Sequence, residues 1–364
     1  MKKIITLATT IALSAVMTAQ TIGNLQFGTD STFDIMTWNI EHFPKNGQTT
    51  INYVSQAITA LDLDVIAFQE INDTTLFKQM VNGLPAYAGF ARLYEYAGLA
   101  FMYKTTTVEI NNVYEIFTAS NYSNPFPRPP FVLDFNFMNQ NFIVIDNHFK
   151  CCGDGYINSA DAWDEETRRL YASTLLKQYI ESHFADKNVI VLGDLNDELT
   201  DNQAHNVFQP LLNDSQNFRF ADMTIATGTT ANWSYPSWPS HLDHILITNE
   251  LFDEFEASSA YIKTIKVDSC FTSWNQYDSN ISDHRPVALK FIPNTISVID
   301  DSNQMAGTIS IYPNPASTEA VFQFLSANKH QLIEIFNSTG QMVQSINIET
   351  DVTEIAWDVR NLPN

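Results

Sequence analysis

The stretch NVIVLGDLNDE, from Asn188 to Glu198, decides how the rest of the chain is interpreted. Its four consecutive apolar residues, 189–192, are mostly β-branched and predict a buried strand that ends at a glycine. Asp194, Asn196 and Asp197 then place polar oxygen atoms on the loop directly after the strand. A strand that carries such groups into a loop positions reacting side chains on a rigid scaffold. The alternative interpretation is a simple Asx-rich turn, and Asp197 fits that interpretation best.

Polar side chains also stand at the ends of five other predicted strands. These are FDIMTWNI (33–40) with Asn39, LDVIAFQE (63–70) with Glu70, NFIVIDNHFK (141–150) with Asn147 and His148, SHLDHILIT (240–248) with Asp243, and ISDHRPVALKF (281–291) with Asp283 and His284. Random placement on loops would rarely put a carboxylate, carboxamide or imidazole at six strand ends. The pattern therefore favours a shared site over six unrelated turns.

Helical segments separate these strands. Thr50 is a candidate N-cap for one helix, and a second helix is predicted from about Ser159 to His183 with Arg168 and Arg169 on its exposed face. Some strands have continuous apolar runs, whereas FVLDFNF (131–137) alternates. The mixture predicts a layered α/β (α+β) protein whose sheets are not all parallel.

Length and composition predict more than one domain in the 364 residues. Residues 1–19, with two lysines, an apolar run and a small residue at the end, are typical of a signal peptide. A catalytic domain is predicted for residues 20–293, a polar linker for 294–308 and a small β-sandwich for 309–364. We expect at least one further strand after the last residue, so this domain is predicted to be truncated. No segment predicts stable membrane insertion.

Charge and cysteine content restrict the possible partners. The formal net charge is -22, because 41 acidic residues outnumber 19 Lys and Arg. Such a surface repels polyanions unless metal ions intervene. The three cysteines allow at most one disulfide, and the sequence leaves open whether Cys151 pairs with Cys152 or whether Cys270 takes part.

The side chains at the strand ends suit one type of chemistry. Most of them offer hard oxygen ligands, and the chain has no Cys-x-x-Cys motif and no His-rich cluster, so Mg²⁺, Mn²⁺ or Ca²⁺ is favoured over zinc. Carboxylates with His148 and His284 suit metal-assisted attack of water on a phosphate. Taken alone, each of these histidines is more often structural.

The order of the motifs is more specific than any one of them. TWNI, FQE, NHFK, GDLND, LDHILI and SDHRPV, at this spacing, resemble the endonuclease/exonuclease/phosphatase superfamily over residues 30–293. The resemblance implies a four-layered αββα sandwich with the site at one edge of its two sheets. It also implies hydrolysis of phosphoesters with Mg²⁺ or a similar ion.

The resemblance assigns roles to individual residues. Asn39 and Glu70 correspond to the metal-binding pair, Asp194 and Asn196 to the pair that handles water and phosphate, and His284 to a histidine paired with Asp243. The implied metal ligands are Asn39, Glu70 and Asp283; the implied catalytic residues are His148, Asp194, Asn196, Asp243 and His284; Arg128 and Asn147 complete the substrate side. The alternative interpretation of Arg128 is an ordinary surface arginine. Asn147 occupies a position where the family commonly has Thr.

Trp233 and Tyr235 precede Asp243 and are predicted to stack on bases or sugars, with packing under a long loop as the alternative. The predicted function is a secreted, metal-dependent phosphodiesterase, an extracellular endonuclease acting on DNA or RNA. A sphingomyelinase-like or small-molecule phosphoesterase and a non-catalytic binding module are the alternatives. IYPNPA and STGQ near the C-terminus resemble the sorting domain of the type IX secretion system, which implies the secretion machinery as a partner and export from the cell.

Overall fold

The computed structural model describes residues 21–95 and 97–294, and from the C-terminal region residues 309–312, 316, 318–324, 331–337, 342–348 and 354–360. The chain divides into two compact units on either side of residue 295. The predicted signal peptide and nearly all of the predicted linker lie outside the described residues.

The first unit contains two mixed sheets of six strands each within its described part. One sheet has the order β11-β12-β1-β2-β4-β3 and the other the order β5-β6-β7-β8-β10-β9. The strands are β1 Phe33–Phe43, β2 Val65–Ile71, β3 Tyr87–Arg92, β4 Gly98–Lys104, β5 Val108–Glu115, β6 Phe131–Phe137, β7 Gln140–His148, β8 Asn188–Asp194, β9 Phe218–Phe220, β10 Asp243–Thr248, β11 Tyr261–Thr264 and β12 Val287–Phe291. Strands β1 and β2 are parallel, as are β7 and β8, whereas their other neighbours are antiparallel. The predicted mixture of strand directions is therefore confirmed.

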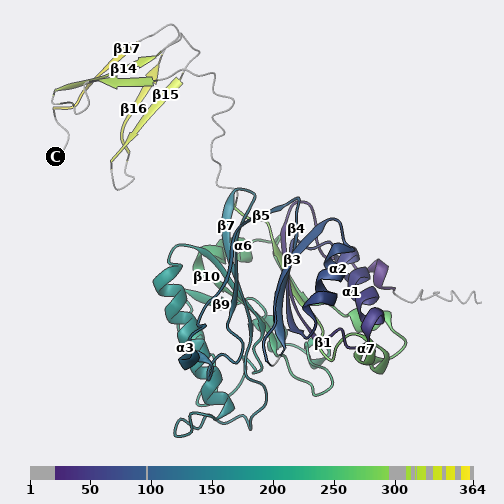
Figure 1. Cartoon of the computed structure of the whole chain (residues 1–364). Coiled ribbons are helices and arrows are strands. Elements are labelled where there is room, and N and C mark those ends of the chain that lie inside the picture. Colours follow the sequence, from purple (N-terminus) through teal and green to yellow (C-terminus); the bar gives the residue numbers. More distant parts are fainter. Residues whose placement is uncertain are drawn as a thin grey trace, which may run out of the picture. The chain divides into compact units, whose positions relative to one another are not determined.

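Helices cover the outer face of each sheet (Figure 1). The helices of this unit are α1 Gly47–Leu61, α2 Thr74–Asn82, α3 Glu165–His183, α4 Gln209–Leu212, α5 Met223–Ala226, α6 Phe252–Glu256 and α7 Trp274–Asn280, with short 3₁₀ turns η1 Ile22–Asn24, η2 Ser120–Tyr122, η3 Thr230–Asn232, η4 Asn249–Leu251 and η5 Val267–Cys270. The short helices α5 and α6 do not cover an outer face but pack against the core between the sheets. One apolar core lies under α1, α2 and α7, a second between the sheets, and a third under α3 and α4. This is the predicted four-layered αββα sandwich.

Three local predictions need correction. Helix α1 begins at Gly47, and Thr50 is not its cap, because the Thr50 hydroxyl donates a 2.7 Å hydrogen bond to the Asn280 carbonyl. Helix α3 begins at Glu165, where Asp164 caps it by accepting from the Thr167 N–H. Arg169 is not on an exposed face: only 3% of it is accessible to solvent.

The second unit is all-β in its described residues. Strands β13 Ile309–Tyr312, β14 Glu319–Phe324 and β17 Glu354–Asp358 form an antiparallel sheet, and β15 Gln331–Phe336 pairs with β16 Met342–Ile348. Phe322 and residues of β15 and β17 pack together between the two sheets. Within the part of the chain described, no helix combines the length and the apolar character that crossing a membrane requires.

Candidate active site

The polar strand ends converge because of strand direction. Strands β1 and β2 are parallel with Asn39 opposite Gln69, and β7 and β8 are parallel with His148 opposite Asp194. Strand β10 is antiparallel to β8, so its first residue, Asp243, also pairs with Asp194. Carboxyl ends of parallel strands and the start of an antiparallel neighbour meet at one edge of a sheet. Two sheets packed face to face thus bring both sets of side chains to the same end.

Asp194 is the centre of the site. Its Oδ2 accepts a 2.8 Å hydrogen bond from the Asn39 amide and lies 3.5 Å from His148 Nε2 and 3.7 Å from His284 Nε2. Burial raises the pKa of Asp194 to about 6, against the opposing influence of His284 and the Asn39 hydrogen bond. Residues from three other predicted strands therefore contact this one carboxylate.

His284 is held in a charged state. Its Nδ1 lies 2.7 Å from Asp243 Oδ2, and the ring of Tyr235 packs on it with 4.8 Å between ring centroids. Burial alone would lower the pKa of His284, but the carboxylates of Asp243 and Asp194 raise it to about 10. Asp243 is itself fully buried, so little water screens this ion pair.

His148 has the opposite environment. Burial holds the pKa of His148 well below its usual range, and the positive charges of Arg128 and His284 lower it further. The Arg128 guanidinium lies 3.5 Å from the His148 carbonyl oxygen, within the field of Glu70 and Asp194. The site therefore has one imidazole with a lowered pKa and one with a raised pKa, and both lie within 4 Å of Asp194 Oδ2.

Carboxylates gather around Glu70. Its Oε1 accepts from the Asn39 amide at 3.2 Å and its Oε2 from the His42 backbone N–H at 3.1 Å, while the Asp283 N–H donates to Glu41 Oε2 at 2.9 Å. Burial raises the pKa of Asp283 to about 7, and repulsion from Glu41 and Glu70 adds to the shift. Hard oxygen donors under mutual repulsion fit a divalent cation, which relieves that repulsion. Glu41, which salt-bridges Lys45, is a member of this group that motif matching did not select.

Backbone strain coincides with the site. Glu41, His42, Glu70 and Asn196 all have φ between 26° and 65°, in the left-handed region that non-glycine residues rarely occupy. Such conformations persist where the surrounding structure imposes them, and they concentrate at functional sites. Gly193 also has a positive φ, 137°, and a Cβ there would lie 1.8 Å from the Asn147 carbonyl oxygen.

Three predicted residues lie differently from the rest. Asn196 is adjacent to Asp194, but its amide donates to the Phe149 carbonyl at 3.2 Å. Asn147 is buried, and its amide donates to the Ile145 carbonyl at 3.0 Å. The Trp233 indole N–H donates to the Ile225 carbonyl at 3.1 Å, and its ring packs against the core between the sheets. Trp233 therefore packs under the loop, which is the alternative to stacking on a base or sugar.

A buried group behind the loop escaped the sequence analysis. Asp222 Oδ2 accepts from His241 Nε2 at 3.0 Å and from His244 Nδ1 at 2.6 Å. His244 Nε2 donates to the Asp197 carbonyl at 2.9 Å, so both ring nitrogens of His244 donate. Asp222, His241 and His244 form what we term the brace, which ties β10 to the loop after Asp194. His244 was adjacent to Asp243 in the motif LDHILI, but strand alternation places it on the opposite face.

The brace also has the residue types of a metal site, since its three ligand atoms lie within 4.8 Å of one another. Its hydrogen bonds argue against that use. The Ser234 N–H donates to His241 Nδ1 at 3.3 Å, so the proton of neutral His241 resides on Nε2, the nitrogen that faces Asp222. A protonated nitrogen cannot bind a metal ion, and we interpret the brace as structural.

A second support is centred on Arg169. Its guanidinium donates to Asp197 Oδ2 at 2.8 Å and to the carbonyls of Lys150 and Cys152, each at 2.7 Å, and it salt-bridges Glu166 at 3.2 Å. Asp197, interpreted as a turn residue, therefore anchors the loop. Cys151, Cys152 and Cys270 are free cysteines, so the structure contains none of the disulfides that the sequence allows.

Comparisons with known proteins agree with this fold. The model of the Endonuclease/Exonuclease/phosphatase family matches residues 36–284, and that of the secretion system C-terminal sorting domain matches residues 310–364. The sorting domain marks proteins exported by the type IX system, so the predicted secretion is confirmed. The search of curated proteins found no match.

Solved structures show the same fold at low sequence identity. They include D. rerio TDP2 complexed with single strand DNA product (TM-score 0.54, 14% identity, 72% of this chain and 99% of that chain). The human Nocturnin catalytic domain with bound sulfate anion is similar at a TM-score of 0.51 and 15% identity, over 72% of this chain and 94% of that chain. An endonuclease/exonuclease/phosphatase from Bacteroides vulgatus has a TM-score of 0.50 and 16% identity, over 72% of this chain and 98% of that chain.

Proposed function

This chain belongs to the Endonuclease/Exonuclease/phosphatase family, and from that premise we propose that it is a secreted, metal-dependent phosphodiesterase that cleaves DNA or RNA outside the cell. Members of the family are phosphoric ester hydrolases, and most depend on a metal ion. The observation that carries the proposal is the position of Asp194, whose Oδ2 faces the Nε2 atoms of both His148 and His284 and lies one hydrogen bond from Asn39.

The proposed reaction is in-line attack of water on phosphorus. The water oxygen forms the new P–O bond, its proton passes to Asp194 Oδ2, and the bond to the leaving oxygen breaks. The amide of Asn39 donates to Asp194 Oδ2 and fixes the carboxylate in place. Asp194 is nearly fully buried, so bulk water does not compete for its oxygen atoms.

The two histidines act on the phosphate. His284, held by Asp243, presents an Nε2–H to the charge that develops on the phosphoryl oxygens, or protonates the leaving oxygen. His148 lies on the other side of Asp194 and offers a second nitrogen to the same group. Stabilisation of developing charge by fixed donors in a buried site is a large contribution to catalysis.

A divalent ion bound here would neutralise phosphate charge and polarise the P–O bond. Glu70 and the side-chain oxygen of Asn39 are the residues proposed to hold it, with Asp283 nearby. In the structure Asn39 Oδ1 accepts a 3.0 Å hydrogen bond from the Glu41 N–H, and that carbonyl oxygen has a second lone pair for an ion.

Nucleic acid is the proposed substrate class. A protein of the same fold, D. rerio TDP2, has been solved with single strand DNA product, which supports a polynucleotide here. Trp238 adds support because 78% of it is exposed on the turn between Tyr235 and Ser240, close in sequence to the ring that packs on His284. Exposed aromatic rings beside a phosphate site bind unpaired bases by stacking.

Incubation of plasmid DNA and of single-stranded RNA with the full chain tests the proposal, in Mg²⁺ or Mn²⁺ and again with chelator. We expect metal-dependent cleavage of at least one polymer, and loss of cleavage in Glu70→Ala and Asp194→Asn. Sphingomyelin vesicles and bis(4-nitrophenyl) phosphate serve as parallel substrates. Hydrolysis of sphingomyelin without cleavage of either polymer would refute the nuclease assignment. If none of these substrates is hydrolysed in a metal-dependent way, the assignment of the chain as a phosphodiesterase is refuted.

A further inference from the structure

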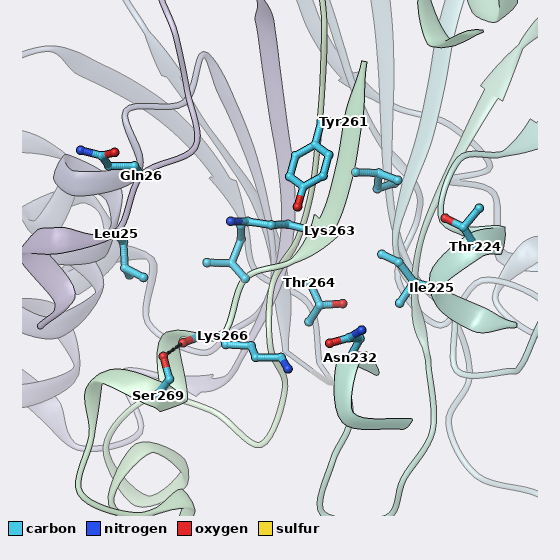
Figure 2. Close-up of a pocket in the computed structure, with 12 residues that line it drawn as sticks. Leu25, Gln26, Thr224, Ile225, Asn232, Tyr261, Lys263, Thr264, Lys266 and Ser269 are labelled. Atoms are coloured by element: carbon cyan, nitrogen blue, oxygen red, sulfur yellow. Dashed lines mark hydrogen bonds between the residues drawn. The ribbon is translucent and has the colours of Figure 1, made fainter. Parts of the chain in front are cut away.

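A pocket with a basic lining lies beside the edge strand β11. Its volume is about 420 Å³, and it is bounded by β11 on one side and by α5 and η3 on the other (Figure 2). Lys263 and Lys266 line it, and no Asp or Glu does. In a chain where 41 acidic residues outnumber 19 basic ones, such a lining favours an anion.

Three side chains point toward one another inside the pocket. Figure 2 shows the Thr264 hydroxyl, the Asn232 amide and the Lys266 ammonium directed at the same space. Thr264 is only 6% exposed, and within the described residues its Oγ1 has no hydrogen-bond partner. An unpaired buried hydroxyl costs about 1–3 kcal/mol, a cost that a ligand atom would remove. Lys266 has no carboxylate ion pair among the described residues, so its charge is available as well.

Both walls of the pocket lead to the catalytic end of the sheets. Thr264 pairs with Val287 at the start of β12, and three residues of extended chain, at most about 10 Å, separate Val287 from His284. On the other wall, Asn232 is three residues from Tyr235, whose ring packs on His284. The pocket is thus close enough for one polymeric ligand to occupy it and the active site together.

We propose that this pocket binds a backbone phosphate of the same nucleic acid strand whose scissile phosphodiester lies at Asp194. The inference rests on the proposed function and specifies its substrate as a polymer that extends beyond the catalytic residues. Lys266 supplies the charge, and Thr264 and Asn232 donate hydrogen bonds to the phosphate oxygens. Tyr261 lies on the rim with 52% of its surface exposed, and it offers a ring on which a base can stack.

Binding measured without cleavage tests this proposal. The full chain is titrated in EDTA against a fluorescently labelled single-stranded 20-nucleotide DNA, and anisotropy is recorded over a series of salt concentrations. We expect Lys266→Gln to raise the Kd about fivefold at low salt and to reduce the salt slope by about 0.7, the value for one phosphate contact to a single strand. Thr264→Val keeps the shape and should raise the Kd without changing the slope. Lys187→Gln, at an exposed lysine outside the pocket, is the matched control.

The outcomes separate the pocket from the active site. Hydrolysis of bis(4-nitrophenyl) phosphate should be unchanged in Lys266→Gln and Thr264→Val, because this small diester does not reach the pocket. A wild-type Kd and salt slope in both variants would overturn the proposal. Displacement of the strand by submillimolar inorganic phosphate at constant ionic strength would overturn it too, since free phosphate would then be the ligand. If the strand binds through the pocket but is never cut, the proposed function fails and the binding site stands.

Discussion

His148 and His284 show how far the environment of one residue type controls its chemistry. Both lie within 4 Å of Asp194 Oδ2, but only His284 has a carboxylate, Asp243, on its second ring nitrogen. The carboxylates raise the pKa of His284 to about 10 despite its burial, whereas burial and the nearby Arg128 lower that of His148. Titratable groups whose pKa values are pushed apart are typical of an acid and its neutral counterpart in one active site.

The Asp243→Asn substitution tests the importance of this pairing. The amide cannot stabilise an imidazolium, and it leaves His284 free to adopt the other tautomer. We expect kcat for bis(4-nitrophenyl) phosphate to fall by a factor of about 10²–10⁴ with KM little changed. His284→Gln should be about as damaging, and the double variant no worse than either single variant. Additive losses would mean that the two residues do not act as a pair.

Metal binding depends on Glu70 if our assignment is correct. We expect Glu70→Gln to weaken the affinity for Mn²⁺ by at least about tenfold, because a charged ligand is replaced by a neutral one. Isothermal calorimetry of the full chain measures this directly. Glu109→Gln, on the exposed side of β5, is the control and should bind the ion as the wild type does. Equal affinity in both variants would remove Glu70 from the site.

Among the structural elements, the loop after β8 depends on two buried supports. Arg169 of α3 holds the Asp197 carboxylate together with the carbonyls of Lys150 and Cys152, and the brace holds the Asp197 carbonyl through His244. Both supports act on the residue three positions after Asp194. The proposed catalytic carboxylate, Asp194, thus lies between the end of β8 and a loop that both supports hold in place.

Removal of Arg169 should cost stability. Arg169→Met leaves Glu166 and Asp197 buried without a positive partner, and we expect the free energy of unfolding to fall by about 3–5 kcal/mol. Urea denaturation followed by circular dichroism measures the loss. Arg168→Met, at the adjacent and more accessible position, should change stability by less than about 1 kcal/mol. Equal losses in the two variants would show that Arg169 is no special anchor.

The brace predicts a pH dependence. Burial lowers the pKa of His244, but the Asp222 carboxylate and the Asp197 carbonyl raise it above its ordinary value overall. A raised folded-state pKa gives stability that is fully present below the unfolded value of about 6.5 and is lost as the pH rises through the folded value. The stability gap between wild type and His244→Gln should therefore be largest, about 3 kcal/mol, near pH 6 and should shrink toward pH 10. Urea denaturation across that range measures the gap, and the exposed His183→Gln should show no such trend.

At the scale of the whole molecule, the sorting-domain match and the proposed catalytic site lie in different units. Residues 36–284 match the catalytic family and residues 310–364 match the sorting domain, and the two compact units divide between these segments. Every residue of the candidate site lies in the first unit. The proposed chemistry is therefore assigned to residues of the first unit.

This separation predicts the result of a truncation. A chain of residues 21–295 should fold, bind Mn²⁺ and hydrolyse bis(4-nitrophenyl) phosphate with the kcat of the full chain. A precursor of residues 1–295, which keeps the predicted signal peptide, should not be exported by a type IX secretion host, in contrast to the full precursor. Activity assays on the purified truncation and immunoblots of the culture medium measure the two effects. A truncation that aggregates would show that the units depend on each other.

Much of the architecture followed from local pattern. Apolar runs such as 189–192 identified buried strands, and the family resemblance that the ordered motifs carry implied both the αββα fold and a site at one edge of the sheets. Prediction was less successful where a local signal has several structural outcomes. Thr50 has an N-cap side chain but hydrogen-bonds to Asn280. Arg169 has a charged side chain but is buried, and besides the nearby Glu166 its partners are Lys150, Cys152 and Asp197, which are distant in the sequence.

The sequence alone determined which side chains could react, because strand ends and their polar residues are local properties of the chain. The motif GDLND identifies Asp194 and its polar neighbours as candidate site residues from the sequence alone. Only the tertiary structure decided that Asp194 faces both His148 and His284, that Trp233 is turned into the core, and that Thr264, Asn232 and Lys266 share a pocket. Those relations arise from sheet packing and strand alternation between distant segments, and no local pattern encodes them.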